Sequence, residues 1–508
     1  MSEPAASGGQ QIARKTAHAI FWNYASYGLG KGLVFLTTAI LARLLTPAEF
    51  GIVGYATLAI AYLTVLRDLG LGPALIQRRE DIDEASNTVF SLNLIMGAVL
   101  AVATFAIAPL VAGYFREPLV TPLLRVLAFN FVINAFGSVH VVRLQRELEF
   151  QKKLIPDVGH SIIKGVVSIG LALLGFGVWS LVIGQLAGAI TSVVLSWIVF
   201  PWRPRLSIRP HLARALLGFG VSVIGVDVIS VVYDNLDYLI IGRMFGNADL
   251  GIYTQAYKLP ELLVLSMLWV MTKALFPAYS KMQDDPDALR RGFLTTIRLV
   301  QIICLPISLG LIIAARPIVL VAFGDQWLAA VPIVRVLALF ALVSSIGFNV
   351  GDVYKAVGRP DILVKLELFT LALLIPTLIF GARFGLIGVA IGHLVVSLIH
   401  MVVRLFIATR FVRVTFWEIV AQLVPASLAG GALAVLAVPA LLLTDGIGAF
   451  FQLIIVALAG AMGYLSVLWL VERESVLRVM RVIGLDNLKG RSVRALFSRR
   501  APSSGDLE

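Results

Sequence analysis

The 508-residue chain has little charge and almost no cysteine. Only 14% of its residues are Asp, Glu, Lys or Arg, whereas a typical soluble domain has about a quarter. The single cysteine, Cys304, excludes an intramolecular disulfide and a cysteine metal cluster. The 6 histidines lack metal-ligand spacing, and nothing resembles a phosphate-binding loop. We therefore predict no cofactor and no metal, and we do not expect ATP to be the direct energy source.

Apolar residues are abundant instead, at 59% of the chain, and the mean hydropathy is +0.91. A soluble fold could not hide so much apolar surface, so lipid must be the solvent for most of this chain. Runs of about 20 residues are long enough to cross the hydrocarbon core as helices. About fourteen such runs predict an all-α membrane protein; they lie near 18–42, 50–72, 89–113, 119–142, 155–175, 178–200, 214–241, 250–275, 293–320, 330–352, 361–381, 385–409, 418–441 and 447–471. The close pairs 155–175/178–200 and 361–381/385–409 are expected to form tight helical hairpins.

Positive charge is concentrated in alternate loops and in the C-terminal tail, which together hold most of the 42 Lys and Arg residues. This bias predicts that those loops and both termini are cytoplasmic. The net charge of +12 is thus an orientation signal, and we predict no nucleic-acid partner. Residues 1–17 lack the apolar core of a cleavable signal peptide. The basic tail either binds anionic lipid at the inner leaflet or simply flanks the last span.

Parts of the chain resemble each other in the same order, which predicts duplication of a six-helix unit. Gly51 recurs as Gly251, and both are expected to permit close helix approach. Two units with an even number of helices are parallel repeats, with the ligand path between them. The matching segments are 42–56 with 242–256, 125–128 with 335–338, and 177–184 with 385–392. The predicted domains are a cytoplasmic segment 1–17, lobes 18–211 and 212–414, two added helices within 415–471, and a cytoplasmic tail 472–508.

Six segments of the chain resemble the polysaccharide-transporter branch of the multidrug/oligosaccharidyl-lipid/polysaccharide (MOP) flippase superfamily. They are LARLLTPAEFGIVGYA (41–56), RDLGLGPALIQRRE (67–80), GFGVWSLVIGQLAG (175–188), DNLDYLIIGRMFGNADLGIYTQAYKLPE (234–261), LFPAYSKMQDD (275–285) and AFGDQW (322–327). The resemblance implies a V-shaped pair of six-helix lobes in the cell inner membrane that works by alternating access.

The cargo implied by this resemblance is an undecaprenyl-pyrophosphate-linked oligosaccharide, moved to the periplasmic leaflet for exopolysaccharide, capsule or O-antigen synthesis. Membrane lipid, a polymerase and other polysaccharide-assembly proteins are the implied partners. A multidrug antiporter of the same superfamily is the alternative. A membrane glycosyltransferase or polymerase is disfavoured because the predicted exterior loops are short, and we do not expect an enzyme.

Cations inside predicted spans are candidates for binding the pyrophosphate, because a charge in lipid is costly unless it faces protein or water. Lys31 and Lys164 lie deep in the first lobe, where they line the cavity or form structural ion pairs, Asp157 being a poor partner for Lys164. Arg125 matches Arg335 in the repeat, which also fits a structural role, and Arg298 near an inner end could snorkel. Lys258 is expected to pair with Glu261 beside a kink at Pro260.

Carboxylates cluster in the seventh predicted span at Asp227, Asp234 and Asp237. They are expected to face the inter-lobe cavity, where they bind sugar hydroxyls, take up a coupling ion, or close a gate by an inter-lobe ion pair. Tyr27 and Tyr55 are the aromatic candidates for stacking on sugars, although aromatic belts at the membrane interface use the same residue type.

Overall fold

Every regular element in the computed structural model, which describes residues 28–67 and 70–473, is a helix. The first described helix covers 28–44, and α2 begins directly after it at Pro47. Thr46 caps α2: its Oγ1 accepts from the N–H of Glu49 at 3.3 Å, and its own N–H donates to Glu49 Oε2 at 2.7 Å. Proline fits the first turn of a helix because its missing N–H would have no partner there.

The remaining elements follow with short connections. In the first half they are α2 (Pro47–Thr64), α3 (Leu71–Gln77), α4 (Ile82–Phe115), α5 (Val120–Arg146), α6 (Phe150–Leu173) and α7 (Val178–Val199). In the second half they are α8 (Pro210–Met244), α9 (Asn247–Pro260), the π-turn η1 (Glu261–Leu265), α10 (Ser266–Ser280), α11 (Pro286–Ile313), α12 (Ala315–Ala322), the 3-10 turn η2 (Asp325–Ala330), α13 (Val331–Ile346), α14 (Val350–Ala356), α15 (Asp361–Gly381), the 3-10 turn η3 (Ala382–Phe384) and α16 (Gly385–Val412). The chain continues with α17 (Phe416–Leu443) and α18 (Ala449–Val471).

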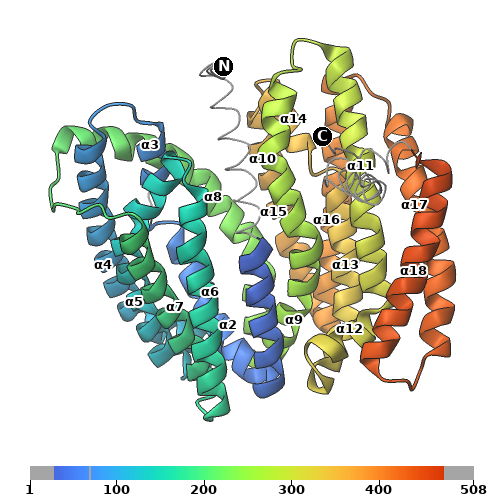
Figure 1. Cartoon of the computed structure of the whole chain (residues 1–508), viewed down its shortest axis with the longest axis horizontal. Helices are drawn as coiled ribbons and strands as arrows, with labels where there is room; N and C mark the ends of the chain where they lie inside the picture. The colour runs from blue at the N-terminus through green and yellow to red at the C-terminus, as the bar shows by residue number, and fades with distance from the viewer. Residues whose placement is uncertain (1–27, 68–69, 474–508) are drawn as a thin grey trace, which may run out of the picture.

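The helices form two bundles, which Figure 1 shows side by side. The first helix, α2 and α4–α7 make one bundle, and α9–α16 make the other. The long α8 packs against α3 and α4 of the first bundle and against α9 and α15 of the second. The bundles meet at the end that carries α2, α9 and α12, and they lie apart at the opposite end (Figure 1).

Ten helical ranges in the described residues are long and apolar enough to span a membrane. One of them, 361–412, contains both α15 and α16, which form the tight hairpin that the sequence predicted. The other predicted hairpin is also confirmed, since α6 ends at Leu173 and α7 begins at Val178. Gly175 and Gly177, at φ +83° and +51°, permit that turn because glycine has no Cβ to clash in the left-handed region.

The predicted span 250–275 is not one straight helix. It is divided into α9, η1 and α10 directly after Pro260. Proline lacks an N–H and its ring displaces the carbonyl one turn earlier, so the helix widens into a π-turn at Glu261–Leu265. The π-turn lies where the second bundle faces the first, since its Glu261 pairs with Lys31 of the first helix.

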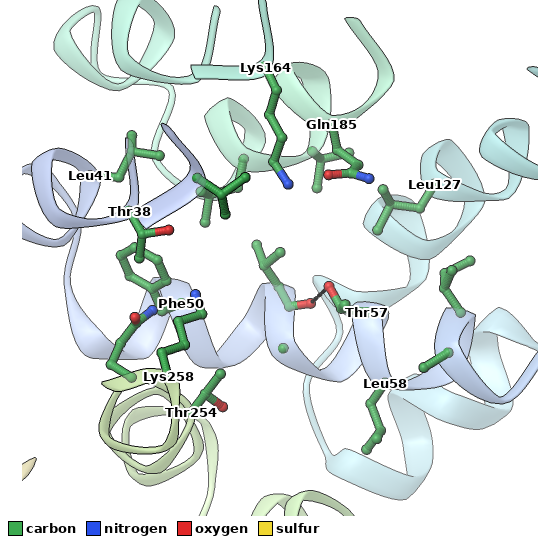
Figure 2. Close-up of a pocket in the computed structure, with 18 of the residues that line it drawn as sticks. Thr38, Leu41, Phe50, Thr57, Leu58, Leu127, Lys164, Gln185, Thr254 and Lys258 are labelled. Atoms are coloured by element: carbon green, nitrogen blue, oxygen red, sulfur yellow. Dashed lines mark hydrogen bonds between the residues drawn. The ribbon is translucent and has the colours of Figure 1, made fainter. Parts of the chain in front are cut away.

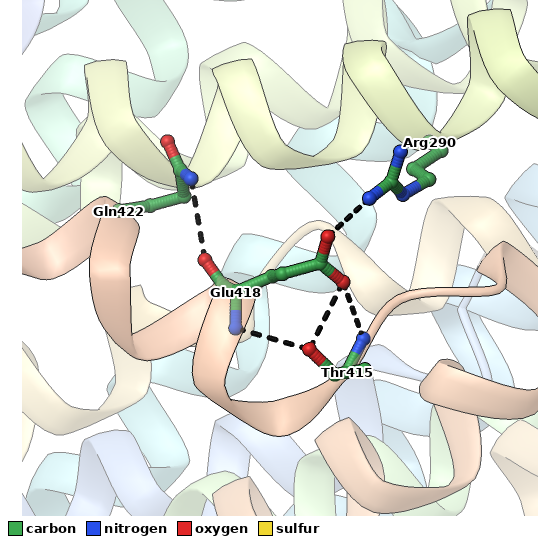
Figure 3. Close-up of polar contacts among 4 residues, drawn as sticks. All are labelled: Arg290, Thr415, Glu418 and Gln422. Atoms are coloured by element: carbon green, nitrogen blue, oxygen red, sulfur yellow. Dashed lines mark hydrogen bonds and ion pairs between the residues drawn. The ribbon is translucent and has the colours of Figure 1, made fainter.

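The added helices α17 and α18 form a hairpin that packs on α11, on the side away from the first bundle (Figure 1). Thr415 and Glu418 cap α17 reciprocally, and the same Glu418 carboxylate accepts a hydrogen bond from Arg290 of α11 (Figure 3). One turn further along α17, Gln422 Oε1 accepts from Arg298 Nε at 2.8 Å. The hairpin is therefore fastened to the second bundle by polar contacts as well as by packing.

Candidate transport site

A cavity of about 500 Å³ lies where the two bundles face each other. Its wall comes from the first helix, α2, α5, α6 and α7 of the first bundle, and from α8 and α9 on the other side. Figure 2 shows Lys164 and Gln185 on one side of this space and Lys258 and Thr254 opposite. Because transporters with parallel repeats bind their ligands between the lobes, this cavity is the candidate site.

Two lysines from different bundles give the cavity positive charge. Lys164 projects from α6, and Lys258 projects from α9, with its Nζ 5.9 Å from the centre of the Phe50 ring. Among the described residues, no carboxylate lies within ion-pair distance of either Nζ. Unpaired cations inside a membrane bundle are costly unless water or an anion compensates them. The pair is therefore suited to an anionic ligand that contacts both bundles.

Lys258 was missed by sequence reasoning, which paired it with Glu261. Glu261 Oε1 instead lies 3.5 Å from Lys31 Nζ of the first helix. The spacing in the sequence could have indicated this placement. Lys258 follows Gly251 by two helical turns and therefore lies on the same face of the helix. Since Gly251 was expected to meet the other lobe, Lys258 should have been placed toward that lobe as well.

Lys31 lies outside the residues that line the cavity, on the helix that contributes Val34 and Thr37 to its wall. Its ion pair with Glu261 joins the first helix to η1 and therefore links the two bundles. Both side chains are partly exposed, at 38% and 44%, so solvent screens the pair. In this structure Lys31 thus takes the second role considered for it, a structural ion pair, and its contact with substrate stays a prediction.

Neither candidate arginine reaches the cavity. The Arg125 guanidinium lies over the Phe105 ring of α4 at 5.1 Å, because α4 and α5 pack side by side within the first bundle. Arg298 extends toward the added hairpin, where its Nη1 lies 3.0 Å from Glu472 Oε1 and its Nε donates to Gln422. Arg125 and Arg298 thus lie outside the residues that line this cavity, and their contact with substrate stays a prediction.

The tyrosine candidates are not placed at the cavity either. Tyr27 lies outside the described residues. Tyr55 is buried, its ring stacks on Phe115 with the ring centres 4.2 Å apart, and its hydroxyl donates to the carbonyl oxygen of Gly242 at 3.1 Å. Its hydroxyl is thus used to join α2 to α8, which leaves Tyr55 without a free face for a sugar.

The three carboxylates of α8 have different surroundings. Asp234 is exposed. Asp237 is only 1% exposed and accepts a hydrogen bond from the Tyr253 hydroxyl at 3.0 Å, so it is buried inside the second bundle and does not face the cavity. Side chains of α9 and α16 cover this face of α8, since Tyr253 and His393 lie beside Asp237. The side chain of Asp227 lies outside what the structure describes.

The bundles are sealed together beyond the cavity, at the end where α2 and α9 cross; we call this the closed end. Trp327 Nε1 and Gln326 Nε2 both donate to the carbonyl oxygen of Ala42, at 2.7 and 2.5 Å. Arg43 Nη2 donates in the opposite direction, to the carbonyl oxygen of Val321 at 2.6 Å. Trp327 is fully buried in a core cluster that contains residues of both bundles. The cavity is therefore blocked on this side by inter-bundle packing and hydrogen bonds.

Solved structures of known transporters share this fold. The lipid II flippase MurJ in an inward closed conformation matches with a TM-score of 0.69 and 16% identity, covering 89% of this chain and 99% of that one. An inward-facing multidrug resistance MATE family transporter of the MOP superfamily matches with a TM-score of 0.63 and 17% identity, covering 75% and 94%. The fold is thus that of the MOP superfamily.

Sequence comparison then gives the family. A family model described as "Polysaccharide biosynthesis protein" matches residues 40–332, and the chain belongs to that family. The lipopolysaccharide biosynthesis protein WzxC of Escherichia coli (strain K12) is 29% identical over 396 residues, which cover 75% of this chain and 78% of WzxC. The resemblance drawn from the sequence is confirmed at this level: the chain belongs to the polysaccharide biosynthesis protein family and has the fold seen in transporters of the MOP superfamily.

Proposed function

We propose that this protein moves an undecaprenyl-pyrophosphate-linked oligosaccharide from the cytoplasmic to the periplasmic leaflet by alternating access. The observation that carries the proposal is the pair Lys164 and Lys258, which approach one cavity from different bundles. A pyrophosphate carries several negative charges and can contact both ammonium groups, each of which acts as a point charge. A ligand bound to both lysines connects the two bundles. Its binding can therefore change how the bundles are arranged relative to each other, which alternating access requires.

The rest of the wall suits a sugar. Asn130 and Gln185 contribute amides, and Thr57 and Thr254 contribute hydroxyls. The amides can donate to and accept from sugar hydroxyls. The two threonine hydroxyls donate to backbone carbonyls of their own helices, so toward a sugar they act as acceptors. The hydrocarbon tail stays in the bilayer, because apolar surface gains nothing by leaving lipid for a polar cavity. We thus assign the head group to the cavity and the tail to the membrane.

Orientation follows from the charge of the loops. The loops at the closed end contain few cations, whereas the opposite end carries clusters such as Arg143, Arg146, Lys152 and Lys153. By the positive-inside rule the closed end faces the periplasm and both termini are cytoplasmic. The cavity would then receive substrate from the cytoplasmic side, as a flippase needs at the start of its cycle.

We further propose that the chain crosses the cell inner membrane fourteen times. The proposed spans are the ten candidate ranges, with 361–412 counted as two helices because it is divided at η3, together with the first helix, α2 and α8. The lobes are the two six-helix repeats, followed by the α17–α18 hairpin. The relative WzxC is named for lipopolysaccharide synthesis, and we extend the pathway to exopolysaccharide, capsule or O-antigen. A polymerase that consumes the flipped unit is the expected partner.

The test is relocation of a fluorescent polyprenyl-pyrophosphate disaccharide in proteoliposomes, followed by a membrane-impermeant quencher. We expect relocation of this lipid, no uptake of a cationic dye such as ethidium, and no product from nucleotide sugar. Dye transport without lipid relocation would identify a multidrug antiporter instead. Extension of the glycan by nucleotide sugar would identify a transferase.

A further inference from the structure

The connection from α7 to α8, residues 200–209, forms neither helix nor strand and lies against the start of α4; we call it the strap. Three of its backbone N–H groups, one at every second residue as in an extended chain, donate to side-chain oxygens of α4. The pairs are Arg205 with Asn87 Oδ1 at 2.8 Å, Ser207 with Ser91 Oγ at 3.0 Å and Arg209 with Thr88 Oγ1 at 3.5 Å. The strap is therefore held in place mainly by its backbone.

Trp202 fastens the beginning of the strap. Its ring centre lies 6.3 Å from that of Phe90 of α4, and the Arg143 guanidinium of α5 lies 5.6 Å from the Trp202 ring centre. The Trp202 carbonyl oxygen lies 3.1 Å from His140 Nε2. These contacts fix the strap to two helices of the first bundle without using the side chains that follow Trp202.

Four exposed side chains of the strap combine positive charge with apolar surface. Leu206 is 78% exposed and Ile208 is 45% exposed, and Arg203 and Arg205 are exposed as well. Because side chains alternate along an extended chain, the two arginines lie on one side of the strap and the two aliphatic side chains lie on the other. The strap thus has a cationic side and an apolar side.

The arginines of the cationic side have no acidic partner in the part of the chain that the structure describes. The two carboxylates in the first turn of α4 are paired elsewhere, Asp83 with Arg143 at 2.6 Å and Glu84 with Arg209. The charges of Arg203 and Arg205 are therefore available to an anion from outside the protein.

The strap lies at the level of the membrane surface. It contacts α4 between Glu84 and Ser91, and the apolar span predicted for this helix begins near residue 89. These contacts extend about 10 Å along α4 at 1.5 Å per residue. They therefore cross the boundary between the hydrocarbon core and the headgroup layer, which is about 5–8 Å thick. In Figure 1 the connection from α7 to α8 runs along the edge of the first bundle that faces away from the second bundle.

We propose that the strap binds an anionic phospholipid of the leaflet opposite the closed end, which is the cytoplasmic leaflet in the proposed orientation. Arg203 and Arg205 bind the headgroup phosphate, since a planar guanidinium can donate two N–H groups to one phosphate. Leu206 and Ile208 lie at the acyl chains, because exposed apolar surface gains by leaving water. A phospholipid offers a phosphate next to hydrocarbon and so matches both sides of the strap, whereas a soluble anion matches only one.

The strap is a different site from the transport cavity. None of its residues lines that cavity, and it faces the surrounding lipid. Its ligand is therefore a resident lipid of the bilayer, and the inference holds whatever the cargo is. Because α8 begins at Pro210 directly after the strap and packs against both bundles, a bound lipid also stabilises the attachment of α8 to the first bundle.

The test measures which lipid lies beside the strap in nanodiscs. The protein carries Cys304→Ala and Ser207→Cys, with an environment-sensitive dye at position 207, where the serine side chain is exposed. Acyl chains of phosphatidylglycerol or of phosphatidylcholine are brominated in turn, and the quenching of the dye is compared. We expect phosphatidylglycerol to be preferred at this position by roughly fivefold for each arginine. The preference should fall as salt is raised, because ions screen exposed charges.

Two double variants with equal loss of charge show where the preference arises. Arg203→Gln with Arg205→Gln should remove it. Arg359→Gln with Arg413→Gln, which removes two exposed arginines from loops of the second bundle, is the matched control and should keep it. Arg203→Lys with Arg205→Lys retains the charge and should retain most of the preference, which separates the charge from any effect of the glutamines on folding.

The apolar side is tested by Leu206→Ser with Ile208→Ser, which should reduce quenching by both lipids and leave the preference in place. Equal quenching by the two lipids in the labelled protein, or a preference that survives in Arg203→Gln with Arg205→Gln, would overturn the proposal. So would stronger displacement of brominated phosphatidylglycerol by undecaprenyl-pyrophosphate disaccharide than by unlabelled phosphatidylglycerol, since the strap would then bind the cargo. No step needs transport, so a protein that shows the preference but relocates no lipid-linked oligosaccharide would contradict the proposed function alone.

Discussion

Gly51 and Gly251 hold the first turns of α2 and α9 against each other. A Cβ on Gly51 would lie 1.7 Å from the carbonyl oxygen of Asn247, and a Cβ on Gly251 would lie 2.0 Å from that of Pro47. The two glycines occupy equivalent positions in the repeat, so each lobe presents the same surface to the other. No side chain fits at either position unless the helices separate, so the closed end depends on both glycines.

Gly51→Ala and Gly251→Ala should therefore open the closed end. Forcing extra volume into packed helices costs about 1–3 kcal/mol, which shifts the conformational equilibrium by roughly 5- to 150-fold. The measurement is the reactivity of a cysteine at Thr57 toward a polar thiol reagent added on the closed-end side, with Cys304 replaced by alanine. Gly170→Ala, where a Cβ would meet nothing within 4 Å, is the control and should leave reactivity unchanged. Equal reactivity in all variants would contradict a seal at this crossing.

Trp327→Phe should loosen the same seal more gently. The hydrogen bond from Nε1 to the Ala42 carbonyl is lost, at a cost of about 1 kcal/mol or a severalfold shift toward the open form. The smaller phenyl ring also leaves part of this buried site unfilled, which adds to the shift. Trp197→Phe is the matched control, since its Nε1 donates to the carbonyl oxygen of Phe136 within one bundle. Double electron–electron resonance between labels on α2 and α9 should show broadening for Trp327→Phe only. Equal broadening in both variants would indicate a general loss of stability.

Charge reversal at the inter-lobe pair Lys31–Glu261 distinguishes two roles of Lys31, the ion pair with Glu261 and direct contact with the substrate. If the pair is what matters, Lys31→Glu should slow lipid relocation and the double variant Lys31→Glu, Glu261→Lys should restore most of it. The effect on stability should be small, because both groups are partly exposed and solvent screens them. A double variant as slow as the single one would show that Lys31 contacts the substrate directly.

Arg298→Ala should destabilise the protein without weakening substrate binding. The substitution removes the contacts to Gln422 and Glu472 that fasten the added hairpin to α11, at a cost of about 1–3 kcal/mol for hydrogen bonds to a charged group. The melting temperature in detergent and the affinity for the lipid are measured on the same sample. Lower affinity with an unchanged melting temperature would return Arg298 to the list of substrate ligands.

The sequence was sufficient for features that follow from local pattern. Hydropathy predicted both tight hairpins, and the repeat placed Gly51 and Gly251 at equivalent, close-packed positions. Long side chains were harder to assign, because their partners lie on helices far away in the chain. Arg298 turns to a hairpin that has no counterpart in the repeat, and Glu261 pairs with Lys31 across the bundles, which frees Lys258 for the cavity. Only packing of the two bundles decides such choices.

The most direct test is the affinity of the purified protein for undecaprenyl-pyrophosphate disaccharide in Lys164→Ala, Lys258→Ala and the double variant. Each single substitution should weaken binding by roughly 10- to 100-fold, as loss of one charge-assisted contact implies. Lys365→Ala, an exposed lysine paired with Asp361, should bind as the wild type does. Unchanged affinity in both single variants and in the double variant would contradict the placement of the pyrophosphate between these two lysines.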